Sequence, residues 1–116
     1  MINGSCHCGK ITFEISTKPA YLVSCNCSIC RKLSALWTYS PPDEIKLNAP
    51  EGATVEYLWG DKGIIFHTCN TCGCTTHYTS VKGTRFAVNT HLAEPSEIKD
   101  LRIRHFDGAD TWEFLD

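Results

Sequence analysis

Three cysteines within six residues, Cys25, Cys27 and Cys30, constrain this chain more than any other feature of its sequence. Thiolates bind Zn²⁺ at about 2.3 Å, so the sulfurs of one centre must converge within a few ångströms. The C-x-C-x-x-C spacing brings three thiols together locally. Three protein ligands and an open fourth position are typical of zinc that acts on a substrate. The stretch therefore predicts an open, catalytic zinc site.

Two further pairs of cysteines predict a second, closed site. Cys6 and Cys8 form a C-x-C pair, whose sulfurs share one side if the chain is extended there. Cys69 and Cys72 precede Gly73, and this C-x-x-C-G step is typical of a zinc knuckle in which glycine permits a tight turn. The four thiols of these pairs are predicted to form a four-sulfur structural site. That site would tie the first residues of the chain to its middle.

The chain length and the cysteine content indicate the setting. A length of 116 residues predicts a single domain, residues 1–116, with a modest core. Eight cysteines would suggest a disulfide scaffold in a secreted protein. Residues 1–5 contain neither a charged leader nor an apolar run, so no signal peptide is expected. A cytoplasmic, reducing location is therefore predicted, where metal ligation explains the thiols better than disulfides do.

The charge pattern narrows the class of partner. The formal net charge is −2 and basic residues are scattered, which argues against nucleic acid. No cationic amphipathic run or membrane span stands out, so a small-molecule or protein partner is expected. Lys10, Arg31 and Lys32 adjoin the cysteine clusters and are candidates for moderating sulfur charge. Arg31 is also a candidate for holding an anionic substrate. Nothing in the sequence indicates an oligomeric state.

Hydrophobic periodicity predicts a mainly β fold of short strands with little helix. Ile11, Phe13 and Ile15 alternate with polar residues and predict a half-buried strand within residues 10–16. Helical turns are expected at 28–33, with Ser28 as the cap, and at 94–98. Further strands are expected at 21–24, 36–39, 44–47, 54–59, 64–68, 75–79, 84–89 and 102–106, with turns at 50–52, 60–63 and 82–83. The three tryptophans, Trp37, Trp59 and Trp112, are expected to be core or half-buried aromatics.

Seven of the cysteines, taken with their neighbours, resemble the pattern of a known family. The motifs are Gly4-Ser5-Cys6-His7-Cys8-Gly9, Cys25-x-Cys27-x-x-Cys30-Arg31-Lys32 and Phe66-x-x-Cys69-x-x-Cys72-Gly73. In this order they resemble the glutathione-dependent formaldehyde-activating enzyme family, which includes centromere-protein-V-like members. The resemblance covers nearly the whole chain, although the chain is shorter than the glutathione-handling members.

The resemblance implies a fold, two metals and an activity. The fold would be an Mss4-like β-tent of short antiparallel strands with zinc knuckles, carrying two Zn²⁺ per chain. The structural zinc would map onto Cys6, Cys8, Cys69 and Cys72, and the catalytic zinc onto Cys25, Cys27 and Cys30. The implied activity is that of a carbon–sulfur lyase acting on the S-hydroxymethyl adduct of glutathione and formaldehyde. A small-molecule thiol is therefore the expected partner.

Several residues keep alternative roles at this point. Cys74 lies outside the seven-cysteine pattern, and it could complete the three-sulfur centre, enter the four-sulfur site or be a packed thiol. His7 should point away from Cys6 and Cys8. His67 shares the face of Cys69 and is a candidate donor to it. His91 follows a predicted strand and is a candidate to line a pocket.

Two other functions compete with the lyase. In the first, the chain is a non-catalytic zinc-binding module whose metals are both structural. In the second, it is a redox enzyme such as a methionine sulfoxide reductase of similar fold, which needs a reactive, metal-free cysteine. Only Cys74 is available for that role. The number of protein ligands at each metal distinguishes these possibilities.

Overall fold

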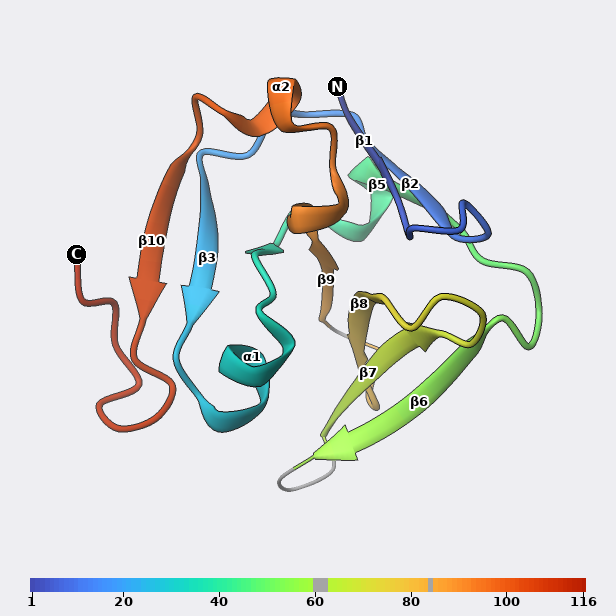
Figure 1. The fold of residues 1–116 in the computed structure, drawn as a ribbon. Helices are drawn as coiled ribbons and strands as arrows, with labels where there is room; N and C mark the ends of the chain where they lie inside the picture. Colours follow the sequence, from blue (N-terminus) through green and yellow to red (C-terminus); the bar gives the residue numbers. More distant parts are fainter. Residues whose placement is uncertain (60–62, 84) are drawn as a thin grey trace.

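The computed structural model describes residues 1–59, 63–83 and 85–116, whose strands form two sheets (Figure 1). The smaller sheet has the order β1-β2-β5 and consists of β1 (Ile2–Ser5), β2 (Thr12–Ile15) and β5 (Ile45–Asn48). The larger sheet has the order β10-β3-β4-β9-β8-β7-β6. Its strands are β3 (Tyr21–Cys25), β4 (Trp37–Thr38), β6 (Thr54–Trp59), β7 (Ile64–Cys69), β8 (Thr75–Ser80), β9 (Phe86–Asn89) and β10 (Arg102–Phe106). The prediction of a mainly β fold with little helix is confirmed.

Helices are short wherever the structure describes the chain. They are α1 (Ser28–Leu33), α2 (Pro95–Ile98) and the 3-10 turns η1 (Pro42–Glu44) and η2 (Thr90–Leu92). None of the helices in the described residues is long and apolar enough to cross a membrane. The prediction that Ser28 caps α1 is wrong, because Cys27 is the N-cap and its sulfur accepts the backbone N–H of Cys30 at 3.4 Å. Ser28 is already the first helical residue.

One strand pair departs from the expected antiparallel arrangement. β10 pairs with β3 in parallel, from Arg102 opposite Tyr21 to Phe106 opposite Cys25. Both strands start at the end of the molecule that carries α2 and run in the same direction (Figure 1). A parallel pair requires a long crossover connection, which the intervening strands of both sheets supply. The other strand pairs among the described residues are antiparallel.

The first strand was not expected from the sequence. Asn3, Gly4 and Ser5 are poor strand formers, so local propensity gives no signal there. The strand forms because Ile2 is buried and pairs with Ile15 of β2. Gly4 is required by packing, since a Cβ there would lie 2.3 Å from the ring of Phe13.

Buried side chains form three separate clusters. The expected face of Ile11, Phe13 and Ile15 is buried, as predicted. Trp37 is fully buried and packs edge-on against Tyr78, with ring centroids 4.9 Å apart. Trp59 is 47% exposed and so half-buried, as expected, whereas Trp112 is 66% exposed, contrary to expectation. Two of the clusters contain cysteines: one includes Cys30, and the other includes Cys6 and Cys69.

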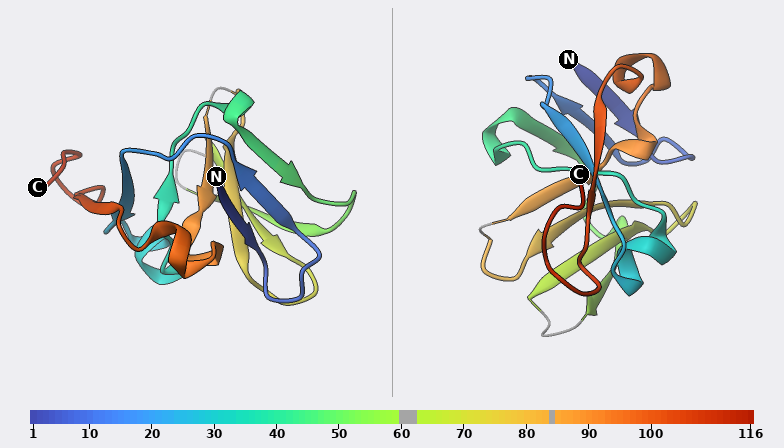
Figure 2. Two further views of the ribbon diagram at one scale, coloured as in Figure 1. Left: turned by 90° about the horizontal axis from the view of Figure 1, so that it is seen from above. Right: turned by 90° about the vertical axis from the view of Figure 1, so that its left-hand side faces the viewer.

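The remaining expected elements match the structure closely. The strands predicted between residues 44 and 106 recur with boundaries shifted by one or two residues. The loop predicted at 60–63 falls mainly on residues 60–62, and the strand predicted at 84–89 begins at residue 84. Residues 60–62 and 84 lie outside the described residues. Figure 2 shows the two sheets from two further directions.

We expect Gly4→Ala to lower the free energy of unfolding by about 1–3 kcal/mol, the usual cost of overpacking a core. The added methyl group would meet both the Phe13 ring and, at 2.7 Å, the carbonyl oxygen of Leu92. Urea denaturation would measure the change. Ser5→Ala, at an exposed position of the same strand, is the control and should shift stability by less than about 0.5 kcal/mol. Equal stability of the two variants would contradict the packing argument.

Candidate metal centres

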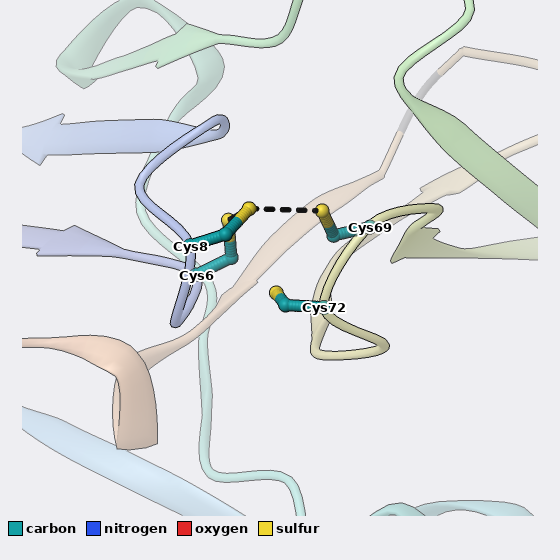
Figure 3. A group of neighbouring side chains, drawn as sticks. All are labelled: Cys6, Cys8, Cys69 and Cys72. Carbon is teal, nitrogen blue, oxygen red and sulfur yellow. Dashed lines mark hydrogen bonds between the residues drawn. The ribbon is translucent and has the colours of Figure 1, made fainter.

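Four sulfurs converge between the two sheets. Cys6 and Cys8 come from the turn after β1, whereas Cys69 ends β7 and Cys72 lies in the turn that follows it (Figure 3). Their sulfur atoms all lie within 4.8 Å of one another, with Cys6 and Cys8 3.6 Å apart and Cys8 and Cys69 3.7 Å apart. A tetrahedron with Zn–S bonds of about 2.3 Å has sulfur-to-sulfur edges of about 3.8 Å. The four-sulfur centre therefore has the dimensions that zinc requires.

The two turns that present these sulfurs have the same backbone hydrogen bonds. The N–H of Cys6 donates to the carbonyl of Ile11 at 3.0 Å, and the N–H of Cys69 donates to that of Cys74 at 2.8 Å. Each bond closes a six-residue turn. Cys74 therefore occupies in the second turn the place that Ile11 occupies in the first.

A glycine with a left-handed backbone shapes each turn. Gly9 and Gly73 have φ angles of 81° and 82°, which residues with a Cβ rarely adopt. Each glycine N–H donates at 3.0 Å to the carbonyl of the first cysteine of its turn, Cys6 or Cys69. The expectation that Cys6 and Cys8 lie in extended chain is wrong. A turn, not a strand, brings their sulfurs together.

Backbone N–H groups donate to sulfurs of the four-sulfur centre. Ile11 donates its N–H to the Cys6 sulfur at 3.3 Å, and Thr71 donates to Cys69 at 3.4 Å. The N–H of Cys74, followed by that of Cys8, lowers the pKa of Cys72 to about 5. Because the thiolate is the metal ligand, these donors prepare the centre for a cation.

The eighth cysteine belongs to the packing around this centre. The Cys74 side chain lies against the cluster of Cys6, Ile11, Ala53 and Cys69 and is outside the group of converging sulfurs. The backbone N–H of His7 acts to lower the pKa of Cys74, but burial and the neighbouring sulfurs together raise this pKa above its usual value. A thiol with a raised pKa is a poor nucleophile. This environment argues against the redox function, which required a reactive Cys74.

The second group of sulfurs lies at the junction of β3 and α1. Cys25 ends β3, Cys27 caps α1, and Cys30 lies in the first turn of that helix. The three sulfur atoms lie within 4.8 Å of one another. Within residues 1–59, 63–83 and 85–116, no further Cys, His, Asp or Glu joins this group. The described chain thus offers three ligands here and four at the other centre.

Hydrogen bonds also hold the sulfurs of the three-sulfur centre. The buried indole N–H of Trp37 donates to the Cys30 sulfur at 3.4 Å, so this core residue also supports the site. The Cys30 thiol bonds to the Cys25 sulfur, which lowers the pKa of Cys25 to about 6 and raises that of Cys30. The three-sulfur centre therefore carries negative charge near neutral pH even before a metal binds.

Two tyrosines lie near the three-sulfur centre. Tyr78 packs on Trp37 and belongs to the same cluster as Cys30, and the Tyr39 ring lies 6.1 Å from that of Tyr78. Burial is the main cause that raises the pKa of each phenol, and the charges of Cys25 and Cys30 raise it further. Both hydroxyls therefore remain protonated, and they hydrogen-bond to each other.

The C-terminal segment contributes residues to the three-sulfur centre that sequence reasoning missed. Asn26, between two of the cysteines, donates its amide N–H to Asp107 at 3.0 Å. A Cβ on Gly108 would lie 2.6 Å from the Cys25 sulfur and 3.6 Å from the Trp112 ring. No local pattern could have revealed these contacts, because they join positions more than 80 residues apart.

Lys10 contacts a ligand sulfur through its backbone N–H, which donates to Cys8, whereas its ammonium bonds elsewhere. The Lys10 ammonium donates to the side chains of Asn70 at 3.1 Å and Thr71 at 3.3 Å, and so links the two cysteine turns. Arg31 and Lys32 lie exposed in the last turn of α1. The structure thus gives Lys10 a cross-linking role.

The histidines do not supply ligands to either centre. His7 is exposed, as expected. His67 hydrogen-bonds to Thr79 at 3.0 Å and stacks on the buried His77 with ring centroids 4.3 Å apart. Burial lowers the pKa of His77 to about 3, so that ring is neutral. His91 is exposed and bonds to the Ser34 carbonyl at the end of α1.

Together, the fold and the sulfurs define a mainly β protein with two cysteine centres that could hold metal ions. Residues 1–102 match the family described as glutathione-dependent formaldehyde-activating enzyme, and the chain belongs to that family. A crystal structure of a Rhodobacter sphaeroides protein is similar, with a TM-score of 0.68 and 22% sequence identity. The match covers 87% of this chain and 98% of that one and supports the fold.

We predict that Cys69→Ser abolishes cooperative unfolding, whereas Cys74→Ser stays folded with unchanged zinc content. A structural zinc in small peptides contributes an apparent ~10–16 kcal/mol, comparable to the roughly 5–15 kcal/mol net stability of a domain. Thermal melting by circular dichroism and zinc analysis of both variants would measure this. A cooperatively melting Cys69→Ser protein would contradict the structural role. Loss of one zinc equivalent in Cys74→Ser would show Cys74 to be a ligand.

Mild chelation should remove zinc first from the three-sulfur centre and leave the fold nearly intact. That centre has one protein ligand fewer and is formed by a single short stretch of chain. Zinc release can be followed with a chromogenic chelator while amide NMR spectra report on the fold. Resonances of residues 25–30 should change before those of residues 6–8 and 69–72. Simultaneous release of both metals with unfolding would mean that both centres are structural.

Proposed function

We propose that this chain is a zinc-dependent carbon–sulfur lyase acting on the adduct of a small thiol with formaldehyde. S-hydroxymethylglutathione is the adduct to which the family description points. The observation that carries the proposal is the difference between the centres: four sulfurs at one, and three without a fourth protein ligand in the described residues at the other. An incomplete protein shell leaves a position for a substrate.

The two centres receive different roles in this proposal. Cys6, Cys8, Cys69 and Cys72 hold a structural zinc between the sheets. Cys25, Cys27 and Cys30 hold a catalytic zinc. The sulfur spacing at the first centre and the mutual proximity of the three sulfurs at the second support two zinc ions per chain.

The reaction needs no oxidant or reductant. When bound, zinc supplies a position that holds the thiol sulfur of the substrate and lowers its pKa toward neutrality. In the forward direction that sulfur forms a bond to the carbonyl carbon of formaldehyde. The electron pair of the C=O π bond moves to oxygen, and oxygen takes up the proton that the thiol lost. The reverse direction breaks the carbon–sulfur bond and returns thiol and formaldehyde.

Groups of this chain assist by holding the ligand sulfurs and by donating hydrogen bonds. The Trp37 indole and the Cys30 backbone N–H each donate to a ligand sulfur, which fixes its position and moderates its charge. The Tyr39 and Tyr78 hydroxyls, which remain protonated, are the candidate neutral donors for a developing oxygen charge.

The alternative is a non-catalytic module with two structural metals. It requires a fourth protein ligand at the three-sulfur centre, and the described residues do not offer one. We also infer a cytoplasmic location, because none of the eight cysteines forms a disulfide and a reducing compartment preserves thiols for metal binding.

Exchange NMR on mixtures of formaldehyde with glutathione and with smaller thiols tests the activity. The zinc-loaded protein should speed adduct exchange, and Cys27→Ser should reduce the rate to that of the uncatalysed reaction. Cys74→Ser is the matched control, because it also removes one thiol but should leave the rate unchanged. Equal exchange rates with the wild type and with Cys27→Ser, for every thiol, would contradict the lyase and favour the zinc-binding module.

A further inference from the structure

The segment after β10 lies outside the residues that match the family, and it folds back over the three-sulfur centre. The match ends at residue 102, whereas the segment comprises residues 107–116. Two backbone hydrogen bonds of 2.8 Å hold it as it returns along β10. The N–H of Asp107 donates to the Glu113 carbonyl, and the N–H of Leu115 donates to the His105 carbonyl. In Figures 1 and 2 it forms the loop that lies beside the junction of β3 and α1. The loop is therefore a feature of this chain beyond the shared family core.

A single residue of the cysteine stretch anchors this loop. The N–H of Asn26 donates to the Phe106 carbonyl at 3.2 Å, and its side-chain amide donates to Asp107 at 3.0 Å. Its side-chain carbonyl accepts the N–H of Ala109 at 3.0 Å. Asn26 lies between Cys25 and Cys27, so these three bonds hold the loop directly against the ligands.

Gly108 brings the loop backbone to the sulfur. A methyl group there would lie 2.6 Å from the Cys25 sulfur and 3.3 Å from the Cβ of Cys27. The same methyl group would lie 3.6 Å from the six-membered ring of Trp112. The Cys25 sulfur and the Trp112 indole thus both lie on the side of Gly108 that a side chain would occupy, and no residue with a Cβ fits there without a shift.

Trp112 is held in place but is not buried. Its side chain is 66% exposed, and its backbone has a φ of 61°, a left-handed value that is uncommon for a residue with a Cβ. The Trp112 N–H donates to the Asp107 carbonyl at 2.7 Å, and its ring packs edge-on against Phe106 at 5.2 Å. Such backbone strain persists where surrounding contacts impose it, and here they fix an accessible aromatic ring beside the centre.

The loop is also acidic. Residues 107–116 contain four carboxylates, at positions 107, 110, 113 and 116, and no Lys, Arg or His. Three thiolates and one divalent cation leave the centre itself with one negative charge. Arg31 and Lys32 lie in the last turn of α1, away from the Cys27 end, and the Arg104 guanidinium is stacked on Phe114 at 3.8 Å. Asp116 pairs with His105 at 2.8 Å, and Asp107 is bonded to Asn26 and Thr111. The exposed carboxylates of Asp110 and Glu113, with the charge of the centre, are therefore what disfavour an anionic substrate.

We propose that residues 107–114 form the substrate-selecting wall of the three-sulfur centre, and that the favoured substrate is the formaldehyde adduct of a small aminothiol. This inference rests on the proposed function and narrows its substrate class. The substrate ammonium group lies against the exposed face of Trp112, where a cation is attracted to the indole ring. The nearby backbone limits the size of the thiol, and the acidic loop disfavours glutathione, which carries two carboxylates. No bond changes beyond those of the lyase reaction are required.

Thiol binding to the Co²⁺-substituted protein tests this inference without a measurement of activity. Cysteamine, 2-mercaptoethanol and 3-mercaptopropionate are similar in size but cationic, neutral and anionic. The cysteine ligands already give a thiolate-to-cobalt absorption band, and the increase in this band on adding each thiol reports its binding. We expect cysteamine to bind most tightly and 3-mercaptopropionate most weakly. Trp112→Ala should weaken cysteamine binding by about 2- to 30-fold, the range of a cation–aromatic contact. Trp112→Phe should retain most of the affinity.

Matched variants separate the possible outcomes. Trp59→Ala removes another partly exposed tryptophan, on edge strand β6, and should leave thiol binding unchanged. Asp110→Asn combined with Glu113→Gln should reduce the preference for cysteamine over 3-mercaptopropionate. Equal affinities for the three thiols, unaffected by Trp112→Ala, would overturn the selecting wall and leave the lyase standing. An unchanged thiolate band with every thiol would overturn the proposed function itself.

Discussion

The fold depends on the meeting of four sulfurs from two turns that are about 60 residues apart in the chain. The turn after β1 belongs to the three-stranded sheet, and the turn after β7 belongs to the seven-stranded sheet. The cluster around these sulfurs contains few other apolar side chains, chiefly Ile11 and Ala53. So small a cluster buries little area, and the hydrophobic effect alone would bind the sheets weakly there. In the proposed function, a metal bound by all four thiolates would supply the missing connection.

The equivalence of the two turns explains how one chain makes a symmetric set of ligands from unlike sequences. C-x-C-G and C-x-x-C-G differ by one residue between the thiols, yet both turns close with the same bond across six residues and a left-handed glycine. The position that closes the turn is Ile11 in one case and Cys74 in the other. Cys74 is thereby placed beside the centre for a backbone reason, and its side chain packs as Ile11 does in the matching turn.

Local patterns in the sequence predicted most of the strands and the grouping of the cysteines. The alternation of Ile11, Phe13 and Ile15 marks a buried face because a strand repeats every two residues. The parts that escaped prediction depend on partners far away. β1 forms only by pairing with β2. β10 pairs with β3, from which it is separated by most of the chain, and the Gly108 contact joins the C-terminal segment to Cys25. The capping role of Cys27 was missed because the sulfur replaces the expected serine oxygen.

The two centres differ in how they are connected to the rest of the molecule. This difference fits the proposal that the four-sulfur centre stabilises the fold and that the three-sulfur centre carries out the reaction. The four-sulfur centre joins two sheets, so any change there disturbs the whole fold. The three-sulfur centre comes from one short stretch, and its ligands are held by local donors such as the Trp37 indole. The loop over it is attached largely through Asn26 and through its own return along β10. Because few core contacts depend on that loop, its residues can vary without loss of the fold. A loop of this kind is therefore the part of the molecule in which substrate preference can change while the metal-binding framework stays the same.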